Sequence, residues 1–276
     1  SGEADNVVYL MAIDLDRYAF GYAVGASHPG VEWSSRITPD ADTPGPDGFD
    51  SKAPLATIGS IPPWLTHGVA GVFAGGFKRE HGSFKVGDLS RVNHYSHFGF
   101  VENGVVFSRL NPFLATLRIT PDGRPDMLTW PEAADKEFRY VLHARQNGVP
   151  LIDGMDAEGN SIPGALVKER GKGAWSGNAA GDPLTIRAAI AIQEKNGKAF
   201  LFAAYFPGAT PTAMARVFQA YHCRYAMGLD MNSLSLCYMA LYIHDPAGAV
   251  SEAEYLIQQM GGANGGDYLR FLERND

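Results

Sequence analysis

Short apolar runs bounded by turn residues recur along the chain, and this pattern predicts β-strands. Residues 7–13 are apolar and partly β-branched, and residues 69–73 resume the pattern after a long irregular stretch. The segments 185–194 and 198–206 are almost continuously apolar, which is typical of strands that are covered on both faces. The sequence therefore predicts buried strands in both halves of the chain.

Two Asn-Gly dipeptides join pairs of apolar runs. Asn103-Gly104 interrupts the stretch 98–107, and Asn196-Gly197 separates the two longest runs. Both residue types tolerate the positive φ angles that a two-residue hairpin turn requires. We therefore expect two β-hairpins.

Three segments carry helix signals. Residues 132–147 follow a proline and end before Gly148, which is the usual order of start and stop residues. Thr210-Pro211 opens a second helix, whose apolar residues recur at helical spacing. Ser251 and Glu254 have the spacing of a capping box for a third helix. We therefore expect an α+β fold with mixed or antiparallel sheets, β-hairpins and packed helices, in a single compact domain over residues 1–276.

Residues 28–63 are rich in proline and glycine, which blocks long regular elements. This Pro-rich excursion is predicted to be a loop over the surface, and ordered loops of that length are typically lids or binding walls.

Composition narrows the possible classes of protein. The chain has 276 residues, of which 45% are hydrophobic, so it can bury a large core. Its net charge of −7, without a dense run of Lys or Arg, argues against nucleic acid as a partner. The longest apolar runs, 199–206 and 236–243, are far shorter than the roughly 18 residues of a transmembrane helix. We expect Cys223 and Cys237 to be free buried thiols, with one disulfide as the alternative.

The first candidate for chemistry is the Gly75-Gly76 turn, which follows the strand 69–73 and precedes Lys78 and Arg79. Successive glycine N–H groups can form an anion-binding nest, which these cations would reinforce. The pattern predicts a phosphate site, and a tight turn with a solvated basic tip is the alternative.

Two further candidates lie on later strands. Arg187 interrupts an apolar strand, and its guanidinium fits either a phosphate or an internal salt bridge. Asp230 ends a short strand and is followed by Asn232 and Ser235, which can supply hydrogen bonds. A carboxylate at a strand end is a candidate nucleophile, general base or metal ligand, and an Asx-turn cap is the alternative. We expect Gly75, Gly76, Arg187 and Asp230 to line one pocket.

Histidines and tryptophans in the loops give weaker signals. The histidines His81, His94 and His97 lack a nearby cysteine or carboxylate pattern, so uncoordinated histidines in a polar loop are the expected reading and a zinc site is the alternative. The loop tryptophans are candidates either for stacking on sugar rings or for anchoring their loops to the core. They are Trp33, Trp64 and Trp175.

The order of the three candidate segments resembles the phosphodiester glycosidase family, the N-acetylglucosamine-1-phosphodiester α-N-acetylglucosaminidase-like domains. The matching segments are 70–77, 187–192 and 214–235, within a resemblance that covers roughly residues 69–242. The resemblance implies a hydrolase that cleaves a glycosidic bond to phosphate in a sugar phosphodiester of a glycan or cell-envelope polymer such as an exopolysaccharide. It implies catalytic roles for Asp230 and Arg187. We expect no cofactor and no bound metal.

The chain departs from the family pattern in two motifs. Ala74 stands where the family has the Asn of Asn-Gly-Gly-Phe, and Met231 and Asn232 stand in the glycine run of Leu-Asp-Gly-Gly-Gly-Ser. These departures favour the alternative that the chain is a non-catalytic glycan or sugar-phosphate binding protein with a degenerate active site. A metal-dependent hydrolase is a third hypothesis.

The resemblance also bears on the location of the protein, whereas the second catalytic carboxylate and the oligomeric state stay open. The family is extracytoplasmic, so a periplasmic or secreted location is expected, although the chain as given carries no signal-peptide pattern. A second catalytic carboxylate, if the reaction uses one, is Asp14, Asp88 or Asp153. The oligomeric state is not predicted.

Overall fold

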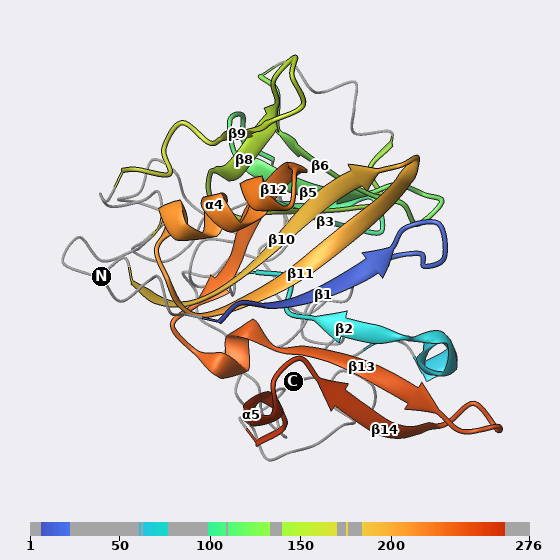
Figure 1. Cartoon of the computed structure of the whole chain (residues 1–276). Coiled ribbons are helices and arrows are strands. Elements are labelled where there is room, and N and C mark those ends of the chain that lie inside the picture. The colour runs from blue at the N-terminus through green and yellow to red at the C-terminus, as the bar shows by residue number, and fades with distance from the viewer. Residues whose placement is uncertain are drawn as a thin grey trace, which may run out of the picture.

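The computed structural model describes residues 7–22, 61, 63–76, 99–108, 110–132, 140–169, 175 and 184–262. Within these residues the protein consists of three β-sheets whose pairings are all antiparallel (Figure 1). Of the Pro-rich excursion, only Ile61 and Pro63 are described, so the predicted lid or binding wall lies outside the described residues.

The largest sheet has six strands in the order β1-β11-β10-β12-β8-β9. In chain order its strands are β1 (Tyr9–Asp14), β8 (Pro150–Met155), β9 (Ser161–Pro163), β10 (Thr185–Lys195), β11 (Lys198–Ala209) and β12 (Cys223–Met231). A five-stranded sheet has the order β4-β3-β7-β5-β6. Its strands are β3 (Phe100–Glu102), β4 (Val105–Ser108), β5 (Ala115–Ile119), β6 (Pro125–Thr129) and β7 (His143–Gln146).

The third sheet has the order β14-β13-β2 and lies below the other two in Figure 1. Its strands are β2 (Gly71–Phe73), β13 (Met239–His244) and β14 (Val250–Tyr255). The α-helices of the described residues are α4 (Pro211–Ala220) and α5 (Gln258–Gly262), and the 3-10 helices η1 (Pro63–Gly68) and η5 (Leu234–Cys237) precede β2 and β13.

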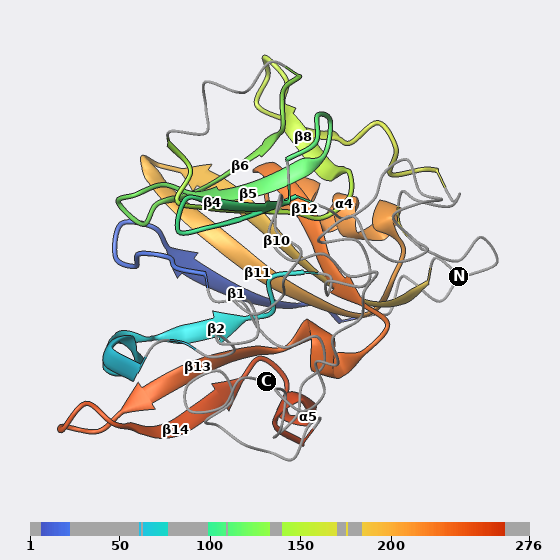
Figure 2. The ribbon, with the colours of Figure 1, turned by 180° about the vertical axis from the view of Figure 1, so that it is seen from behind.

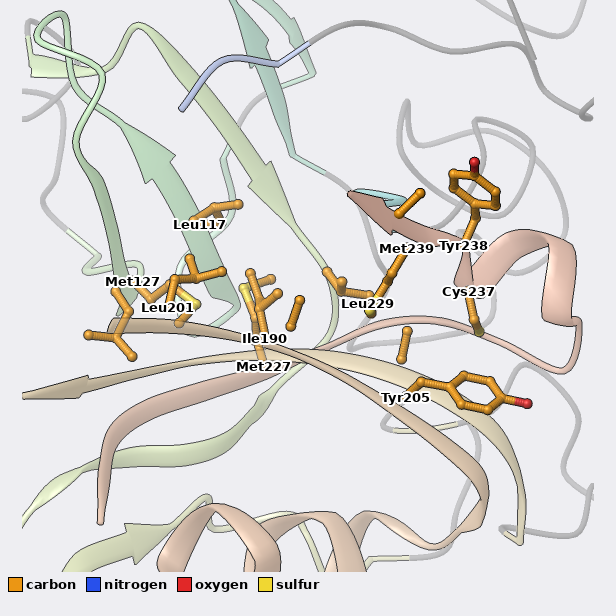
Figure 3. Close-up of a cluster of buried hydrophobic side chains, with 14 of the residues drawn as sticks. Leu117, Met127, Ile190, Leu201, Tyr205, Met227, Leu229, Cys237, Tyr238 and Met239 are labelled. Carbon is orange, nitrogen blue, oxygen red and sulfur yellow. The ribbon is translucent and has the colours of Figure 1, made fainter. Parts of the chain in front are cut away.

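The six-stranded sheet is covered on both faces, and the two coverings differ. On one face, Ile190, Leu201 and Met227 pack with Leu117 and Met127 of the five-stranded sheet (Figure 3). This sheet-covered face continues to the three-stranded sheet, whose buried residues belong to the same cluster. On the other, helix-covered face, helix α4 lies against the sheet (Figure 2), and buried residues of β8, β11 and β12 pack with those of the helix. Burial on both faces explains why these strands are apolar without alternation.

The two predicted hairpins and the central helix are confirmed. Asn103 and Gly104 have φ values of 49° and 75°, and Asn196 and Gly197 have 54° and 74°, as the two-residue turns require. Helix α4 has Thr210 as its N-cap, whose hydroxyl accepts a hydrogen bond from the backbone N–H three residues later.

The α+β prediction is wrong, because the sheets dominate and two of the segments that were expected to be helices contain strands. The segment predicted as a helix over 132–147 contains β7, which pairs with β3 and β5. Long-range strand pairing therefore overrides the local Pro-start and Gly-stop signals. The capping-box segment is strand β14, where the hydroxyl of Ser251 donates to the carbonyl of Ile243 on β13 instead of capping a helix.

Other expectations concern thiols and membranes. Cys223 and Cys237 are both free and buried, as expected. Among the described residues, no helix is both long enough and apolar enough to cross a membrane.

Candidate functional site

The Gly75-Gly76 turn lies where the three-stranded sheet meets the five-stranded one. The turn follows β2, and the backbone N–H of Ala74 donates to the carbonyl of Tyr238 at 2.9 Å. A Cβ on Gly75 would lie 2.8 Å from the Tyr22 ring, and one on Gly76 would lie 2.9 Å from the Asn147 side chain. Gly76 also has φ +131°, which L-residues rarely adopt. Close packing therefore requires both glycines.

Asp230 lies in an irregularity near the end of β12. Met231 pairs with Arg187 of β10 and Gly228 pairs with Ala189, so β12 has one extra residue between these pairs. This β-bulge sets Leu229 and Asp230 together opposite a single residue of β10. Asp230 is buried, and its Oδ1 accepts a hydrogen bond from the backbone N–H of Met231 at 2.7 Å.

A buried arginine that the sequence did not reveal interacts electrostatically with this carboxylate. Arg145 lies on β7 and pairs with Leu117 and Phe100, on the face of the five-stranded sheet that packs against the six-stranded sheet. Its guanidinium carbon lies 5.9 Å from the centre of the Phe100 ring. Burial lowers the pKa of Arg145, and its interactions with Tyr22 and Asp230 work against that shift.

The Asn147 side chain contacts both the glycine turn and strand β12. Its Nδ2 donates to the carbonyl of Gly228 at 2.9 Å, and the same side chain abuts Gly76. We call this set of residues from four parts of the chain the Arg145–Asp230 cluster. Its members are Tyr22, Gly75, Gly76, Arg145, Asn147 and Asp230.

Two more titratable residues border the cluster beside Tyr22. The Tyr22 ring lies 6.5 Å from the ring of His143, whose Nδ1 accepts a hydrogen bond from the backbone N–H of Asn103. Burial lowers the pKa of His143, so this imidazole is neutral at pH 7. Burial raises the pKa of Tyr22, which Arg145 lowers and the buried Glu102 raises further.

Arg187 lies on the helix-covered face of the six-stranded sheet. Its Nε donates to the carbonyl of Ala209 at 3.0 Å, and its Nη1 donates to the carbonyl of Trp175 at 3.2 Å and lies 3.5 Å from the sulfur of Met231. Burial lowers the pKa of Arg187 to about 10, which still leaves it charged at pH 7. Because neighbouring strand residues point to opposite faces, Asp230 and Met231 face different sides. The structure therefore brings Asp230 towards the glycine turn and Arg187 towards α4.

The remaining predicted polar residues lie beyond the bulge or outside the described residues. Asn232 has φ +68°, and its Oδ1 accepts a hydrogen bond from the hydroxyl of Thr185 at 2.9 Å. The hydroxyl of Ser235 lies 2.8 Å from that of Ser233. Lys78 and Arg79 lie outside the described residues, so their predicted role in phosphate binding stays a prediction.

The two described tryptophans of the loops differ. Trp175 is buried, and its indole N–H donates to the carbonyl of Leu166 at 2.7 Å, which makes it an anchor in the core. Trp64 on η1 is 72% exposed, which leaves its ring open to a ligand. Trp33 lies outside the described residues.

Of the alternative carboxylates, Asp14 accepts a hydrogen bond from the backbone of Asp16, and Asp153 accepts one from Thr129. Asp88 lies outside the described residues, as do the three histidines of the zinc hypothesis, His81, His94 and His97. Where the chain is described, no group of three or more His, Cys, Asp or Glu could hold a metal ion.

Arg145 was missed because the sequence analysis assigned its segment to a helix. Read as a strand, His143, Arg145 and Asn147 alternate with neighbouring residues and fall on one face. That alternation is the signal that could have identified them as site residues.

No protein-family model and no curated protein sequence matches the chain. One solved structure that resembles it is the catalytic domain of zebrafish N-acetylglucosamine-1-phosphodiester alpha-N-acetylglucosaminidase, auto-inhibited by its pro-peptide. The TM-score is 0.45 and the identity is 11%, over 90% of this chain and 75% of that chain. Similarity at this level assigns no residue its role.

Proposed function

We propose that the protein is a hydrolase that cleaves the bond between a sugar and phosphate in a sugar phosphodiester of a glycan or cell-envelope polymer. One observation carries the proposal. Asp230, the carboxylate that the sequence motif singles out, is buried and interacts with Arg145 from a different sheet, next to a glycine turn suited to anions. Buried charges from separate elements are typical of functional sites, and structural ion pairs are the competing explanation.

The chemistry divides between the two sides of the scissile bond. The bond between the anomeric carbon and the phosphate oxygen breaks, its electron pair leaves with the phosphate monoester, and water supplies the hydroxyl that the sugar carbon gains. Asp230 acts on the anomeric side, as nucleophile or as the base that accepts a proton from water. The N–H groups of Gly75 and Gly76 and the guanidinium of Arg145 stabilise the leaving phosphate. The route requires no cofactor.

Residues outside the Arg145–Asp230 cluster remain part of the proposal as predictions. Arg187 is the alternative cation for the phosphate, with Lys78, Arg79, Asn232 and Ser235 as further contacts. A periplasmic or secreted location likewise stays a prediction.

The second candidate function is a sugar-phosphate or glycan binding protein without turnover. Met231 favours it, because this residue takes the place of the first glycine in the family motif and its sulfur lies 3.5 Å from Nη1 of Arg187. A side chain there occupies space beside the guanidinium that a glycine would leave open. Ala74, which replaces an asparagine, removes a further polar group.

Asp230→Asn separates the two functions when hydrolysis and binding are measured in parallel. The substitution keeps size and removes charge and basicity, so a catalytic Asp230 loses turnover of sugar 1-phosphodiesters by a factor on the order of 10² or more. Asp122→Asn, in the exposed turn between β5 and β6, is the matched control and keeps its activity. If the wild-type protein binds sugar phosphates but cleaves none of the sugar 1-phosphodiesters tested, the hydrolase hypothesis is contradicted and the binding-protein hypothesis is supported.

Two controls complete the experiment. Thermal unfolding of each variant separates lost chemistry from lost structure. Activity that disappears with a chelator and returns with a divalent metal would replace this mechanism by a metal-dependent one.

A further inference from the structure

His244 ends strand β13 with its ring between two backbone carbonyls. Its Nε2 lies 2.8 Å from the carbonyl oxygen of Val69, and its Nδ1 lies 3.1 Å from that of Gly248. Val69 precedes β2, and Gly248 belongs to the turn between β13 and β14. The ring therefore joins the start of β2 to the tip of the hairpin.

Both carbonyls are acceptors only, and both are held by their own backbone surroundings. In the hairpin tip, Oδ1 of Asp245 accepts from the N–H groups of Ala247 and Ala249 at 2.8 and 2.9 Å. The N–H of Gly248 donates to the carbonyl of Asp245 at 2.9 Å. On the other side, the N–H of Val69 donates to the carbonyl of Thr66, at the end of η1.

A neutral imidazole carries one N–H and can donate to only one of two acceptors, whereas an imidazolium donates to both. We propose that His244 is a pH-sensitive clamp, which closes on protonation and fastens the start of β2 to the β13–β14 hairpin. The proposal concerns the conformation of the three-stranded sheet and does not depend on the proposed function.

The charged groups around His244 favour the protonated form. The hydrogen bonds to Val69 and Gly248 raise the pKa of His244, burial opposes them, and the Asp245 carboxylate raises it further. From η1, His67 approaches the tip, because a Cβ on Gly248 would lie 3.5 Å from the Cβ of His67. On β14, Glu252 pairs with Ile243 and Glu254 pairs with Leu241. Ile243 and Leu241 are on the exposed face of β13.

The direction of the pH effect follows from the sign of the shift. A group whose folded-state pKa is raised stabilises the fold fully below its unfolded pKa, and this contribution is lost as the pH rises through the folded value. The clamp is therefore closed in mildly acidic solution and opens towards alkaline pH. Because β2 leads directly into the Gly75-Gly76 turn, closing it also restrains one end of the Arg145–Asp230 cluster.

Two measurements on the full chain test the clamp. In the wild-type protein, NMR of the imidazole nitrogens should give both Nδ1 and Nε2 protonated at pH 6, with a titration midpoint above the ordinary 6.5. A titration midpoint at or below 6.5 overturns the proposal, independently of the stability measured for any variant.

The second measurement compares His244→Gln with the wild type by thermal unfolding at pH 5.5 and pH 8. The glutamine amide can donate to one carbonyl and does not titrate, so the variant should lose more stability at pH 5.5 than at pH 8. The expected difference between the two losses is on the order of 2–4 °C in Tm, because one hydrogen bond is gained or lost. His222→Asn, a variant of an exposed histidine, should not change the pH dependence. Equal losses at the two pH values contradict the clamp.

Discussion

Among the described residues, each face of the six-stranded sheet buries one arginine, and the described partners of these two arginines differ. Arg187, on the helix-covered face, donates to the carbonyls of Ala209 and Trp175. Arg145, on the sheet-covered side, interacts with the ionisable groups of Tyr22 and Asp230. Neutral carbonyls fix an arginine in place, whereas a carboxylate beside a buried guanidinium provides paired charges that can serve chemistry.

The comparison shows that two residues on paired strands can lie on different faces of one sheet. Arg187 and Asp230 come from the paired strands β10 and β12, but the bulge at Leu229 and Asp230 turns them to different faces. We therefore place the centre of the proposed site on the sheet-covered face.

The largest effect on stability is expected for Arg145→Met. The substitution removes the buried guanidinium that interacts electrostatically with the Asp230 carboxylate, and leaving a buried charge without its counter-charge costs about 3–5 kcal/mol. Urea unfolding at pH 7 measures the loss, with Arg145→Lys as the variant that keeps the charge. A loss below about 1 kcal/mol would mean that Arg145 does not stabilise the carboxylate, and the contrast between the two arginines would fail.

Arg187→Met should cost less, about 2 kcal/mol, because it removes the donors to the neutral carbonyls of Ala209 and Trp175. The same urea experiment measures this variant. A loss equal to that of Arg145→Met would mean that Arg187 has an ionic partner of comparable importance.

Gly76→Ala tests the close approach at the glycine turn. Its φ of +131° and the 2.9 Å contact of the added Cβ with Asn147 predict a loss of about 1–2 kcal/mol. Gly104→Ala is a useful control, because it also has a positive φ but nothing within 4 Å of its Cβ. If the two variants lose equal stability, backbone strain alone explains the effect and the contact with Asn147 adds nothing.

The smallest effect concerns an ion network that ties the two larger sheets together. Asp126 accepts hydrogen bonds from Arg224 of β12 and Arg118 of β5, both at 2.9 Å. Burial would raise the pKa of Asp126, but the bonds from the two arginines outweigh it and lower the pKa.

Asp126→Asn should therefore cost about 0.5–1 kcal/mol at pH 7. A lowered folded-state pKa stabilises the fold above the unfolded value, so the difference from wild type should shrink as the pH falls below the ordinary carboxyl range. Thermal unfolding at pH 7 and pH 3.5 measures both values. A difference that is unchanged at pH 3.5 would show that the charge of Asp126 is not responsible.

Local sequence signals predicted an element correctly where all of them favour the structure that tertiary packing also favours. The Asn-Gly turns and α4 were correct because turn chemistry, capping and apolar periodicity point to the same structure. At β14, the capping-box spacing of Ser251 and Glu254 competed with alternation in 250–255, and pairing with β13 decided the outcome.

The candidate site was less predictable, for two physical reasons. The face on which Asp230 lies depends on one extra residue in β12, and a bulge leaves no reliable mark in a single sequence. Arg145 becomes part of the site only through pairing of β7 with β3 and β5, which joins distant segments. The glycine turn was predictable because two glycines directly after a strand indicate a tight turn, whatever the rest of the chain does.

The most direct test is the affinity for a sugar 1-phosphate of the wild type, Arg145→Lys and Arg187→Lys at matched ionic strength, measured by calorimetry. Lysine keeps the charge and loses the two-pronged donor geometry, and thermal unfolding of each variant checks the fold. We predict that Arg145→Lys weakens binding by about tenfold or more, or about 1.4 kcal/mol, and that Arg187→Lys changes it by less than about threefold. Binding that is weakened by Arg187→Lys and unaffected by Arg145→Lys would contradict this account and place the anion on the helix-covered face.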